Sequence, residues 1–217
     1  MIRLDGVTKT YSTSSGPVKV LDGVDMVLPR GEAIGIVGRN GAGKSTLIRI
    51  ISGAEMPDSG TVERTMSVSW PLAFAGGFQT ALTGLDNLRF ICRVYGVDPD
   101  GCLPFVEDFT ELGIYLREPV STYSSGMRAR LAFATSMVVD FDCYLVDEIV
   151  AVGDSRFQAK CYEELFVKRA DRSRIIVSHD AGFVRAHCDR AAVLIDGKLK
   201  QFESLDSAYD FYTEAMT

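Results

Sequence analysis

The stretch Gly38-Arg39-Asn40-Gly41-Ala42-Gly43-Lys44-Ser45-Thr46 decides the fold of this chain. It fits the pattern Gly-x-x-x-x-Gly-Lys-[Ser/Thr], and it lies between an apolar run, Ile34 to Val37, and an apolar, helix-like segment, Leu47 to Ile51. The glycines let the chain curl so that backbone N–H groups point inward, and the following helix directs its positive end at the same place. Strand, loop and helix in this order predict a binding site for the phosphates of a nucleoside triphosphate.

The residues of this loop have separate expected roles. Lys44 supplies a full positive charge to the outer phosphates, and the hydroxyl group of Ser45 holds Mg²⁺. The other positions offer backbone N–H groups and close packing. The predicted nucleotide-binding residues of the loop are Gly38, Asn40, Gly41, Ala42, Gly43, Lys44, Ser45 and Thr46.

Length and composition narrow the class of protein. The chain has 217 residues and a net charge of −6, which argues against a dedicated nucleic-acid binder because such domains carry a basic face. No uninterrupted apolar run approaches the roughly 18 residues needed to cross a bilayer, so no membrane span is expected. The five cysteines form no Cys-x-x-Cys pair, which suits a reducing compartment and argues against zinc and disulfides.

The pattern along the chain predicts one α/β domain, residues 1–217, with a helical insertion at about 83–139. Two strands, Ile2 to Tyr11 and Val18 to Leu28, flank a loop at Ser12 to Pro17, and short strands occupy Thr61 to Trp70. Strands interleaved with helices imply a mainly parallel sheet covered on both faces. The later predicted elements are strands at Cys143 to Val146, Ile175 to Ser178 and Ala191 to Ile195, and helices at Ser155 to Ala170, near Phe183 and from Ser204 to Ala215.

Two adjacent acidic residues follow the apolar strand that ends at Val146. Asp147 can reach Mg²⁺ through water, and Glu148 is placed to accept a proton from the attacking water. Exposed carboxylates that simply end a strand are the alternative.

Two further polar residues lie where a ligand of such a sheet would bind. His179 follows the strand that ends at Ser178, at the carboxyl edge of the sheet. Gln79 lies at the junction of the core and the helical insertion, where an amide can hold Mg²⁺ or the attacking water and still move with the insertion. Taken singly, a loop glutamine is more often a solvated surface residue.

The segment Tyr123-Ser124-Ser125-Gly126-Met127-Arg128 stands just before a predicted helix. Small hydroxyl residues and a glycine at a helix start can present a serine hydroxyl and several backbone N–H groups to an anion. Ordinary helix capping explains Ser124 or Ser125 equally well.

Together these residues resemble the ATP-binding cassette family of transport ATPases, over essentially the whole chain. The resemblance implies a P-loop α/β cassette with a mainly parallel core sheet, an N-terminal antiparallel β subdomain and a helical insertion. In that family two cassettes face each other head to tail, and each ATP lies between the phosphate loop of one and the signature segment of the other. The implied cofactors are ATP and Mg²⁺.

The resemblance also assigns roles to individual residues. It implies that Tyr11 is the aromatic residue that stacks on adenine. It also implies that Tyr123 to Met127 form the signature, and that Ser124, Ser125 and Gly126 contact the nucleotide bound by a second copy. The catalytic residues that it implies are Glu148, His179 and Gln79; the metal ligands are Ser45, Gln79 and Asp147; and Asp154 matches the aspartate that follows the catalytic base.

Two departures from the usual family pattern indicate a branch. The usual signature is Leu-Ser-Gly-Gly-Gln, whereas this chain has Ser125 and Met127 in place of a glycine and the glutamine, and the segment from Glu148 to Asp154 lacks the usual proline. Both look like the branch that exports bacterial surface polysaccharides: capsule, O-antigen and teichoic acid. The chain ends before the C-terminal carbohydrate-binding domain that some O-antigen members carry, so it looks most like the capsular-polysaccharide exporter's ATPase.

The expected partners are a second copy of the chain and an integral membrane permease, with the protein peripheral on the cytoplasmic face of the bacterial inner membrane. The aromatic residues Phe74, Phe78 and Phe90 are candidates for the surface that meets the permease, and core packing is the alternative for each.

Other functions fit the sequence less well. A ribosome-associated cassette protein would carry two cassettes and a basic linker, and a DNA-repair cassette would need a long coiled coil. A small-molecule kinase or GTPase shares the phosphate loop but leaves Gln79, the signature and His179 unexplained. Import, or export of another substrate, is the alternative, and only the resemblance to the polysaccharide branch favours polysaccharide export.

Overall fold

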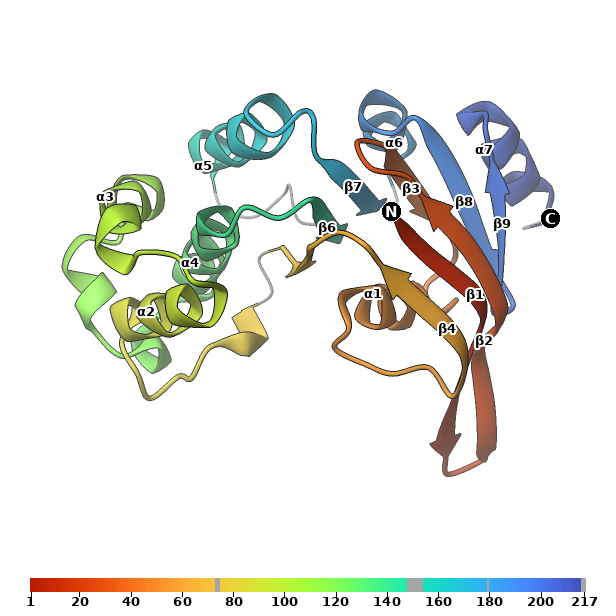
Figure 1. Ribbon diagram of the computed structural model, residues 1–217, viewed down its shortest axis with the longest axis horizontal. Helices are drawn as coiled ribbons and strands as arrows, with labels where there is room; N and C mark the ends of the chain where they lie inside the picture. The colour runs from red at the N-terminus through yellow and green to blue at the C-terminus, as the bar shows by residue number, and fades with distance from the viewer. Residues whose placement is uncertain (73–74, 148–153, 179, 216–217) are drawn as a thin grey trace. The chain divides into compact units, whose positions relative to one another are not determined.

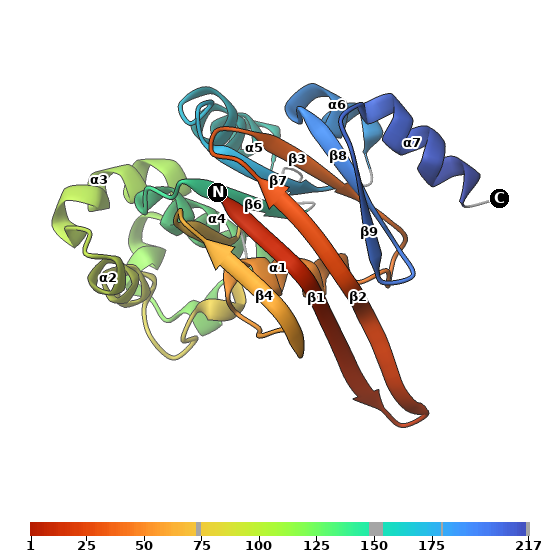
Figure 2. The ribbon, with the colours of Figure 1, turned by 45° about the vertical axis from the view of Figure 1, so that its right-hand side comes forward.

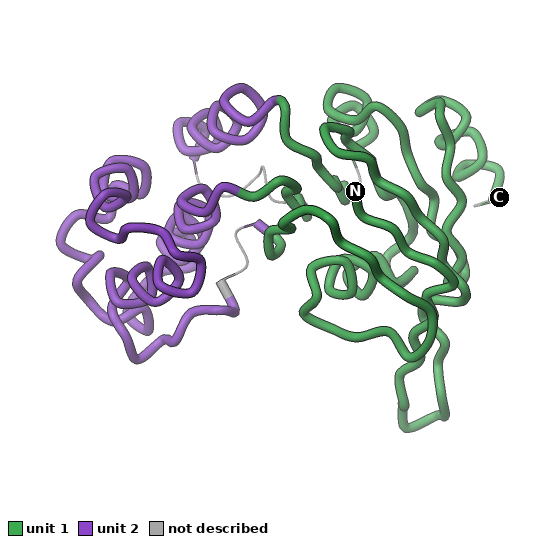
Figure 3. The backbone as a smooth tube through the Cα atoms, in the orientation of Figure 1, with its two compact units in different colours: residues 1–71, 141–148, 171–217 green, residues 72–140, 149–170 purple. Residues whose placement is uncertain are grey.

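The computed structural model describes residues 1–72, 75–147, 154–178 and 180–215. The chain forms two compact units (Figure 3). Unit 1 contains residues 1–71, 141–148 and 171–217, and unit 2 contains residues 72–140 and 149–170. Unit 2 thus reaches beyond the helical insertion expected at 83–139, because the segment after the acidic pair belongs to it.

Unit 1 begins with an antiparallel sheet of three strands in the order β2-β1-β4 (Figure 1). In the β1–β2 hairpin Thr13 pairs with Gly16, so the strands run further than predicted and only two residues form the turn. The loop expected at Ser12 to Pro17 is therefore mostly strand. The bounds are β1 Ile2–Thr13, β2 Gly16–Leu28 and β4 Ser59–Arg64.

The second sheet of unit 1 has six strands in the order β5-β6-β7-β3-β8-β9. The pairings from β5 to β8 are parallel and only β9 is antiparallel, which confirms the predicted mainly parallel core sheet. The bounds are β3 Ala33–Val37, β5 Val68–Pro71, β6 Cys143–Asp147, β7 Ser173–Val177, β8 Arg190–Ile195 and β9 Lys198–Phe202.

Strand β9 was not expected from the sequence. It pairs with β8 across the two-residue turn Asp196-Gly197, whose φ angles are 49° and 77°. Two consecutive left-handed residues match the right-handed twist of a hairpin, so Asp-Gly continues the chain into a strand.

Helices cover both faces of the six-stranded sheet (Figure 2). Residues 192 and 194 of β8 join the core that includes α1, whereas residues 191 and 193 pack against α7, as the two-residue repeat of a strand requires. A Cβ atom at Gly35 would lie 2.4 Å from Val184, so α6 packs directly on β3. The bounds are α1 Lys44–Ser52, α6 Ala181–His187 and α7 Leu205–Glu214.

Unit 2 is helical, and side-chain caps set where its helices begin. The hydroxyl of Thr83 accepts from Asp86 N at the start of α2, and the carboxylate of Asp98 accepts from two N–H groups at the start of α3. The bounds are α2 Gly84–Tyr95, α3 Pro99–Thr110, α4 Ser125–Val138 and α5 Ser155–Tyr162, with 3₁₀ turns at Ala75–Gly77, Gly113–Arg117 and Val120–Thr122.

An aromatic cluster joins three helices of unit 2. Phe109 of α3 stacks on Phe133 of α4 with ring centroids 5.6 Å apart, and Phe157 of α5 meets both rings edge-on at 5.2 and 6.3 Å. The buried ring of Phe157 therefore fixes α5 to α3 and α4.

The helix predicted over Ser155 to Ala170 ends earlier than expected. After α5 the chain forms a π-helical turn, Glu163–Val167, in which Lys168 N donates to Glu163 O. This wider turn buries Glu164, whose carboxylate accepts from Arg169 at 2.8 Å. Helical periodicity alone does not reveal such a wider turn.

Within the described residues no helix combines the length and the hydropathy that a bilayer-spanning segment needs. The five cysteines are free thiols, and burial raises the pKa of Cys143, Cys161 and Cys188 to about 12.

Candidate functional site

The phosphate loop connects the fully buried strand β3 to helix α1, in the order that the sequence predicted. Gly41 and Gly43 have φ angles of 82° and 104°, which L side chains rarely adopt. A Cβ atom at Gly43 would also lie 2.8 Å from a side-chain methyl of Val20 and 2.9 Å from its carbonyl oxygen. The loop therefore requires glycine at position 43 for both its conformation and its packing.

Gly43 is the N-cap of helix α1, and no side chain of the described residues caps the helix. Its first intrahelical bond runs from Leu47 N to Gly43 O at 2.9 Å, and the N–H groups of the first turn of an α-helix point out of its N-terminal end. A helix start of this kind binds an anion with its N–H groups and its dipole. Lys44 is 8% exposed, and its Nζ donates to Gly38 O at 2.7 Å and Arg39 O at 2.9 Å.

A cavity of about 410 Å³ opens over this loop. Asp147, at the carboxyl end of β6, lines the same cavity as Ser45 and Lys44, although it lies about a hundred residues away in sequence. Carboxylate and hydroxyl oxygens are the ligands that Mg²⁺ prefers. The full lining is Val20, Asn40, Gly41, Gly43, Lys44, Ser45, Thr46 and Asp147.

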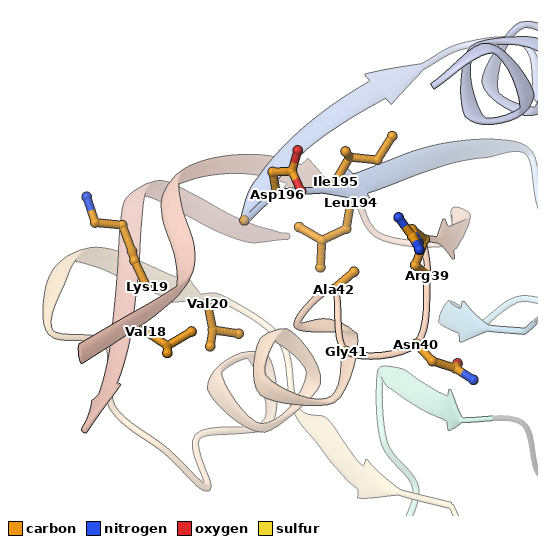
Figure 4. Close-up of a pocket in the computed structure, with 11 residues that line it drawn as sticks. Val18, Lys19, Val20, Arg39, Asn40, Gly41, Ala42, Leu194, Ile195 and Asp196 are labelled. Carbon is orange, nitrogen blue, oxygen red and sulfur yellow. The ribbon is translucent and has the colours of Figure 1, made fainter. Parts of the chain in front are cut away.

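A second cavity, of about 280 Å³, is also lined by the loop and shares Val20, Asn40 and Gly41 with the first (Figure 4). Loop residues 39–42 form one wall, and residues 18–20 of β2 and 194–197 at the β8–β9 turn form the others. A Cβ atom at Gly38 would lie 2.5 Å from Leu194 O, so the loop backs directly onto β8. The start of the loop is therefore packed against the sheet.

Tyr11 is bound to the phosphate-loop helix through its hydroxyl group. The hydroxyl donates to the Glu55 carboxylate, accepts from Arg49 Nη2 at 3.0 Å and lies 3.4 Å from Thr46 Oγ1. Glu55 also accepts from Arg49 Nε at 3.0 Å and pairs with Lys9 at 3.3 Å. The hydrogen bond from Tyr11 is the largest cause that lowers the pKa of Glu55.

Gln79 lies in unit 2, in the segment before α2, and its side chain is exposed. Its backbone is held by Asn87, which is 4% exposed: Gln79 N donates to Asn87 Oδ1 at 2.9 Å, and Asn87 Nδ2 donates to Gln79 O at 3.1 Å. Sequence reasoning missed Asn87. An asparagine among apolar residues inside a helix was the available signal, because asparagine favours caps and turns.

Ser124 caps helix α4, and its hydroxyl accepts from Met127 N at 3.2 Å. Ser125 is the first residue of the helix, and Gly126 follows it. Ser124, Gly126, Met127 and Arg130 line a cavity of about 400 Å³ together with Thr110, Glu111, Leu112 and Tyr115. The helix start thus faces open space, where a hydroxyl that caps a helix can also meet an anion.

Asp154 begins α5 and lies in unit 2 with the signature segment. Its carboxylate accepts from Phe157 N at 2.9 Å and from Arg130 Nη2 at 2.8 Å. The backbone N–H of Phe157 is the largest cause that lowers the pKa of Asp154. Sequence reasoning missed Arg130 and its neighbour Glu111.

The predicted site residues therefore form two groups. Unit 1 brings together the phosphate loop and Asp147, with Tyr11 bound beside Thr46. Unit 2 carries Gln79, Ser124, Ser125, Gly126 and Asp154. Glu148 and His179 lie outside the described residues.

Comparison with known proteins bears on the family of the chain. The family model described as ABC transporter matches residues 21–87. The chain is 60% identical to the ATP-binding protein BexA of Haemophilus influenzae over 99% of each chain. It is 59% identical to the capsule polysaccharide export ATP-binding protein CtrD of Neisseria meningitidis serogroup B over 98% of each.

The fold has a solved counterpart. A dimeric structure of the ATP-binding cassette MJ0796, in a post-hydrolysis state bound to ADP and Pi, superposes with a TM-score of 0.78 at 22% identity, covering 93% of this chain and 98% of that one. The cassette fold expected from the sequence is thereby confirmed, and with the two relatives above it settles the family: the chain belongs to the ABC transporter ATPases and is a nucleotide-binding ATPase of that family.

Proposed function

We propose that this chain is the ATP-hydrolysing subunit of an ABC exporter for a bacterial surface polysaccharide, with capsular polysaccharide as the substrate. The observation that carries the proposal is the end-to-end similarity to a capsule polysaccharide export ATP-binding protein. Export of O-antigen, teichoic acid or another substrate by the same ATPase is the alternative.

The phosphate loop is the ATP-binding element in this proposal. The N–H groups at the start of α1 and the Nζ of Lys44 hold the phosphates, and Tyr11 stacks on adenine, a contact worth about 1–3 kcal/mol by analogy with base stacking. Lys44 already lies over the loop, held by the carbonyl oxygens of Gly38 and Arg39. Its charge thus lies at the loop that binds the phosphates.

Ser45 and Asp147 are the residues that would hold Mg²⁺, with Gln79 as a further ligand. Their hydroxyl, carboxylate and amide oxygens suit a hard cation. Bound Mg²⁺ would neutralise charge on the β- and γ-phosphates. Glu148 would accept the proton of the attacking water, and His179 would be a further catalytic residue.

A second copy of the chain completes each site. Ser124, Ser125 and Gly126 at the start of α4 approach the γ-phosphate held by the partner's phosphate loop, where the helix dipole favours negative charge. Because only the triphosphate supplies this bridge, hydrolysis removes the differential affinity that keeps two copies closed. Support comes from the dimeric state of the structurally similar cassette.

The membrane partner binds unit 2 in this proposal. Phe90, Val94 and Tyr95 of α2 are 63%, 61% and 47% exposed, so much of their apolar surface is accessible among the described residues. Phe78 is partly buried, and Phe74 lies outside the described residues. The protein would then be peripheral, on the cytoplasmic face of the bacterial inner membrane.

Hydrolysis is tested with Glu148→Gln in the purified protein. The variant should bind ATP as the parent does and lose about 10²- to 10⁴-fold in turnover, because a positioned base contributes that much. Glu63→Gln, an exposed change on β4, is the matched control and should keep parental turnover. Equal turnover in the Glu148 variant would contradict the assigned base.

The substrate is tested in cells that lack this chain. Polysaccharide should accumulate inside them, its sugar composition should identify it as capsular, and the parent chain but not Lys44→Ala should restore export. The chain should also co-purify with an integral membrane subunit. Accumulation of O-antigen or teichoic acid would favour the alternative, and accumulation of no glycan would contradict polysaccharide export.

A further inference from the structure

Arg130 of α4 joins three helices at one point. Its Nη2 donates to Asp154 Oδ2 at 2.8 Å, and its Nη1 donates to Thr110 O at 3.3 Å and lies 3.8 Å from Glu111 Oε2. Its guanidinium carbon lies 4.9 Å from the centre of the Phe157 ring. The side chain, only 21% exposed, therefore contacts the end of α3 and the start of α5 from within α4.

The two carboxylate oxygens of Asp154 accept hydrogen bonds from different helices. Oδ1 accepts from Phe157 N at 2.9 Å and caps α5, and Oδ2 accepts from Arg130. The carboxylate thereby links the first turn of α5 to the helix that begins with the signature segment.

Glu111 extends this link along α5. It sits in the left-handed region, with φ 54°, at the end of α3. Its carboxylate accepts from Lys160 Nζ at 2.8 Å and lies 3.3 Å from Arg156 Nη2. The pKa of Glu111 is lowered chiefly by the hydrogen bond from Lys160. Helix α5 is thus attached both at its start and at Lys160.

The two attachments of α5 differ in the helix to which they join it. Lys160 joins the middle of α5 to α3, far in sequence from the signature, whereas Arg130 lies in the same helix as Ser124 and lines the same cavity. Arg130 is therefore the contact that relates the signature to Asp154.

We propose that Arg130 is a positioning residue that fixes the start of α5 to the signature helix, so that Ser124 and Asp154 approach a second copy as one rigid element. This inference rests on the proposed function, in which the signature completes the partner's ATP site. It gives Asp154 a role within its own subunit, since its carboxylate is occupied by Arg130 and the α5 cap.

Arginine suits this position better than lysine. Its planar guanidinium presents five donors in a fixed fork, which lets one side chain reach a carboxylate and a carbonyl oxygen at once. The lysine ammonium is a point charge on a flexible stem. Arg130→Lys should therefore keep the charge and lose most of the positioning.

The test measures ATPase kinetics in Arg130→Met, Arg130→Lys and Asp154→Asn. Asparagine caps a helix as well as aspartate does, so Asp154→Asn weakens the ion pair and keeps the cap. Each variant should lose about 10- to 100-fold in kcat, because a small misplacement of catalytic groups has that effect. KM should stay within about threefold, since the change acts on the closed state and not on nucleotide binding.

The double variant Arg130→Met/Asp154→Asn tests whether Arg130 and Asp154 share one role or have two separate roles. If the residues act through each other, the double variant should lose no more than the worse single variant. If Asp154 acts on the partner and Arg130 acts elsewhere, the two losses should multiply, and the inference would be wrong.

Controls separate positioning from folding and from failure of the proposed function. Arg156→Met removes an exposed pair with Glu111 and should keep parental kcat. Near-parental unfolding temperatures are expected for Arg130→Lys and Asp154→Asn, so parental kcat in both would overturn the inference. If the parent shows no ATPase activity dependent on Glu148, the proposed function fails instead.

Discussion

The hydroxyl group of Tyr11 donates to the carboxylate of Glu55, with distances of 2.7 Å to Oε1 and 2.8 Å to Oε2. Glu55 follows α1, the helix that begins with the phosphate loop, and Arg49 of the same helix contacts both side chains. The aromatic ring proposed to stack on adenine is therefore held by the element that binds the phosphates.

Glu55→Ala should weaken ATP binding and leave the binding of inorganic tripolyphosphate unchanged. Release of the Tyr11 ring would cost part of the stacking contribution, so the dissociation constant for ATP should rise by about 5- to 50-fold. Calorimetric titration of both ligands gives the comparison. Asp22→Ala, which removes the exposed Lys19 pair, is the control. An equal loss for both ligands would show that Glu55 supports the phosphate loop instead.

Gly43→Ala should abolish most nucleotide binding. The substitution places a Cβ atom 2.8 Å from Val20 in a residue with φ 104°, so the loop must shift. Gly41→Ala meets no atom within 4 Å and adds only the strain of φ 82°, about 1 kcal/mol. ATP affinity and thermal unfolding should therefore rank the parent above Gly41→Ala and Gly41→Ala above Gly43→Ala. The reverse order would contradict this account of the loop.

Local sequence signals predicted much of this fold. The phosphate loop was recognisable because its glycine spacing fixes backbone conformation, and Thr83, Ser124 and Ser204 mark the starts of helices because their hydroxyl groups cap them. The parallel sheet followed from the alternation of strands and helices. These features depend on residues close together in the sequence.

Features that depend on distant residues were not predictable. In the sequence, helix α5 belongs to the alternation of strands and helices that predicts the core. In the structure, Phe157 packs on Phe109 and Phe133 and attaches α5 to the helical unit. The partners of Glu55 and Arg130 likewise come from separate segments. No periodicity within one segment reports such pairings.

Asn87→Ala should disturb the segment that carries Gln79. The buried amide makes two hydrogen bonds with the Gln79 backbone, and a third to Thr83 O at 2.9 Å. Their loss should lower the free energy of unfolding by about 1–3 kcal/mol. ATPase activity with the membrane partner should fall more than that of the isolated protein. Arg89→Ala, which removes an exposed pair on the same helix, should change neither quantity.

Asp142→Asn should destabilise the protein in a pH-dependent way. The pKa of Asp142 is lowered chiefly by its hydrogen bond from Arg30, and its carboxylate also accepts from Ser67 N at 2.9 Å. A lowered pKa contributes stability that is present above the unfolded value of about 4 and is lost as the pH falls through the folded value.

The free energy of unfolding of Asp142→Asn should thus lie roughly 1–2 kcal/mol below that of the parent at pH 7, and the difference should shrink below about pH 4. Urea denaturation at pH 7 and pH 3 measures both quantities. A difference that grows with acid would show that the carboxylate is not stabilised in its charged form.

Mixing Lys44→Ala with Ser124→Ala subunits tests whether the signature acts across the dimer. In a head-to-tail pair that contains one of each, one site combines both defects and the other is intact. With random pairing at equal amounts, about a quarter of all sites should regain parental composition, because half of the dimers are mixed. If Ser124 acted within its own subunit, every mixed dimer would have one defect in each site, and activity would not recover at any ratio. The measured dependence of ATPase activity on mixing ratio therefore separates a composite site from a self-contained one.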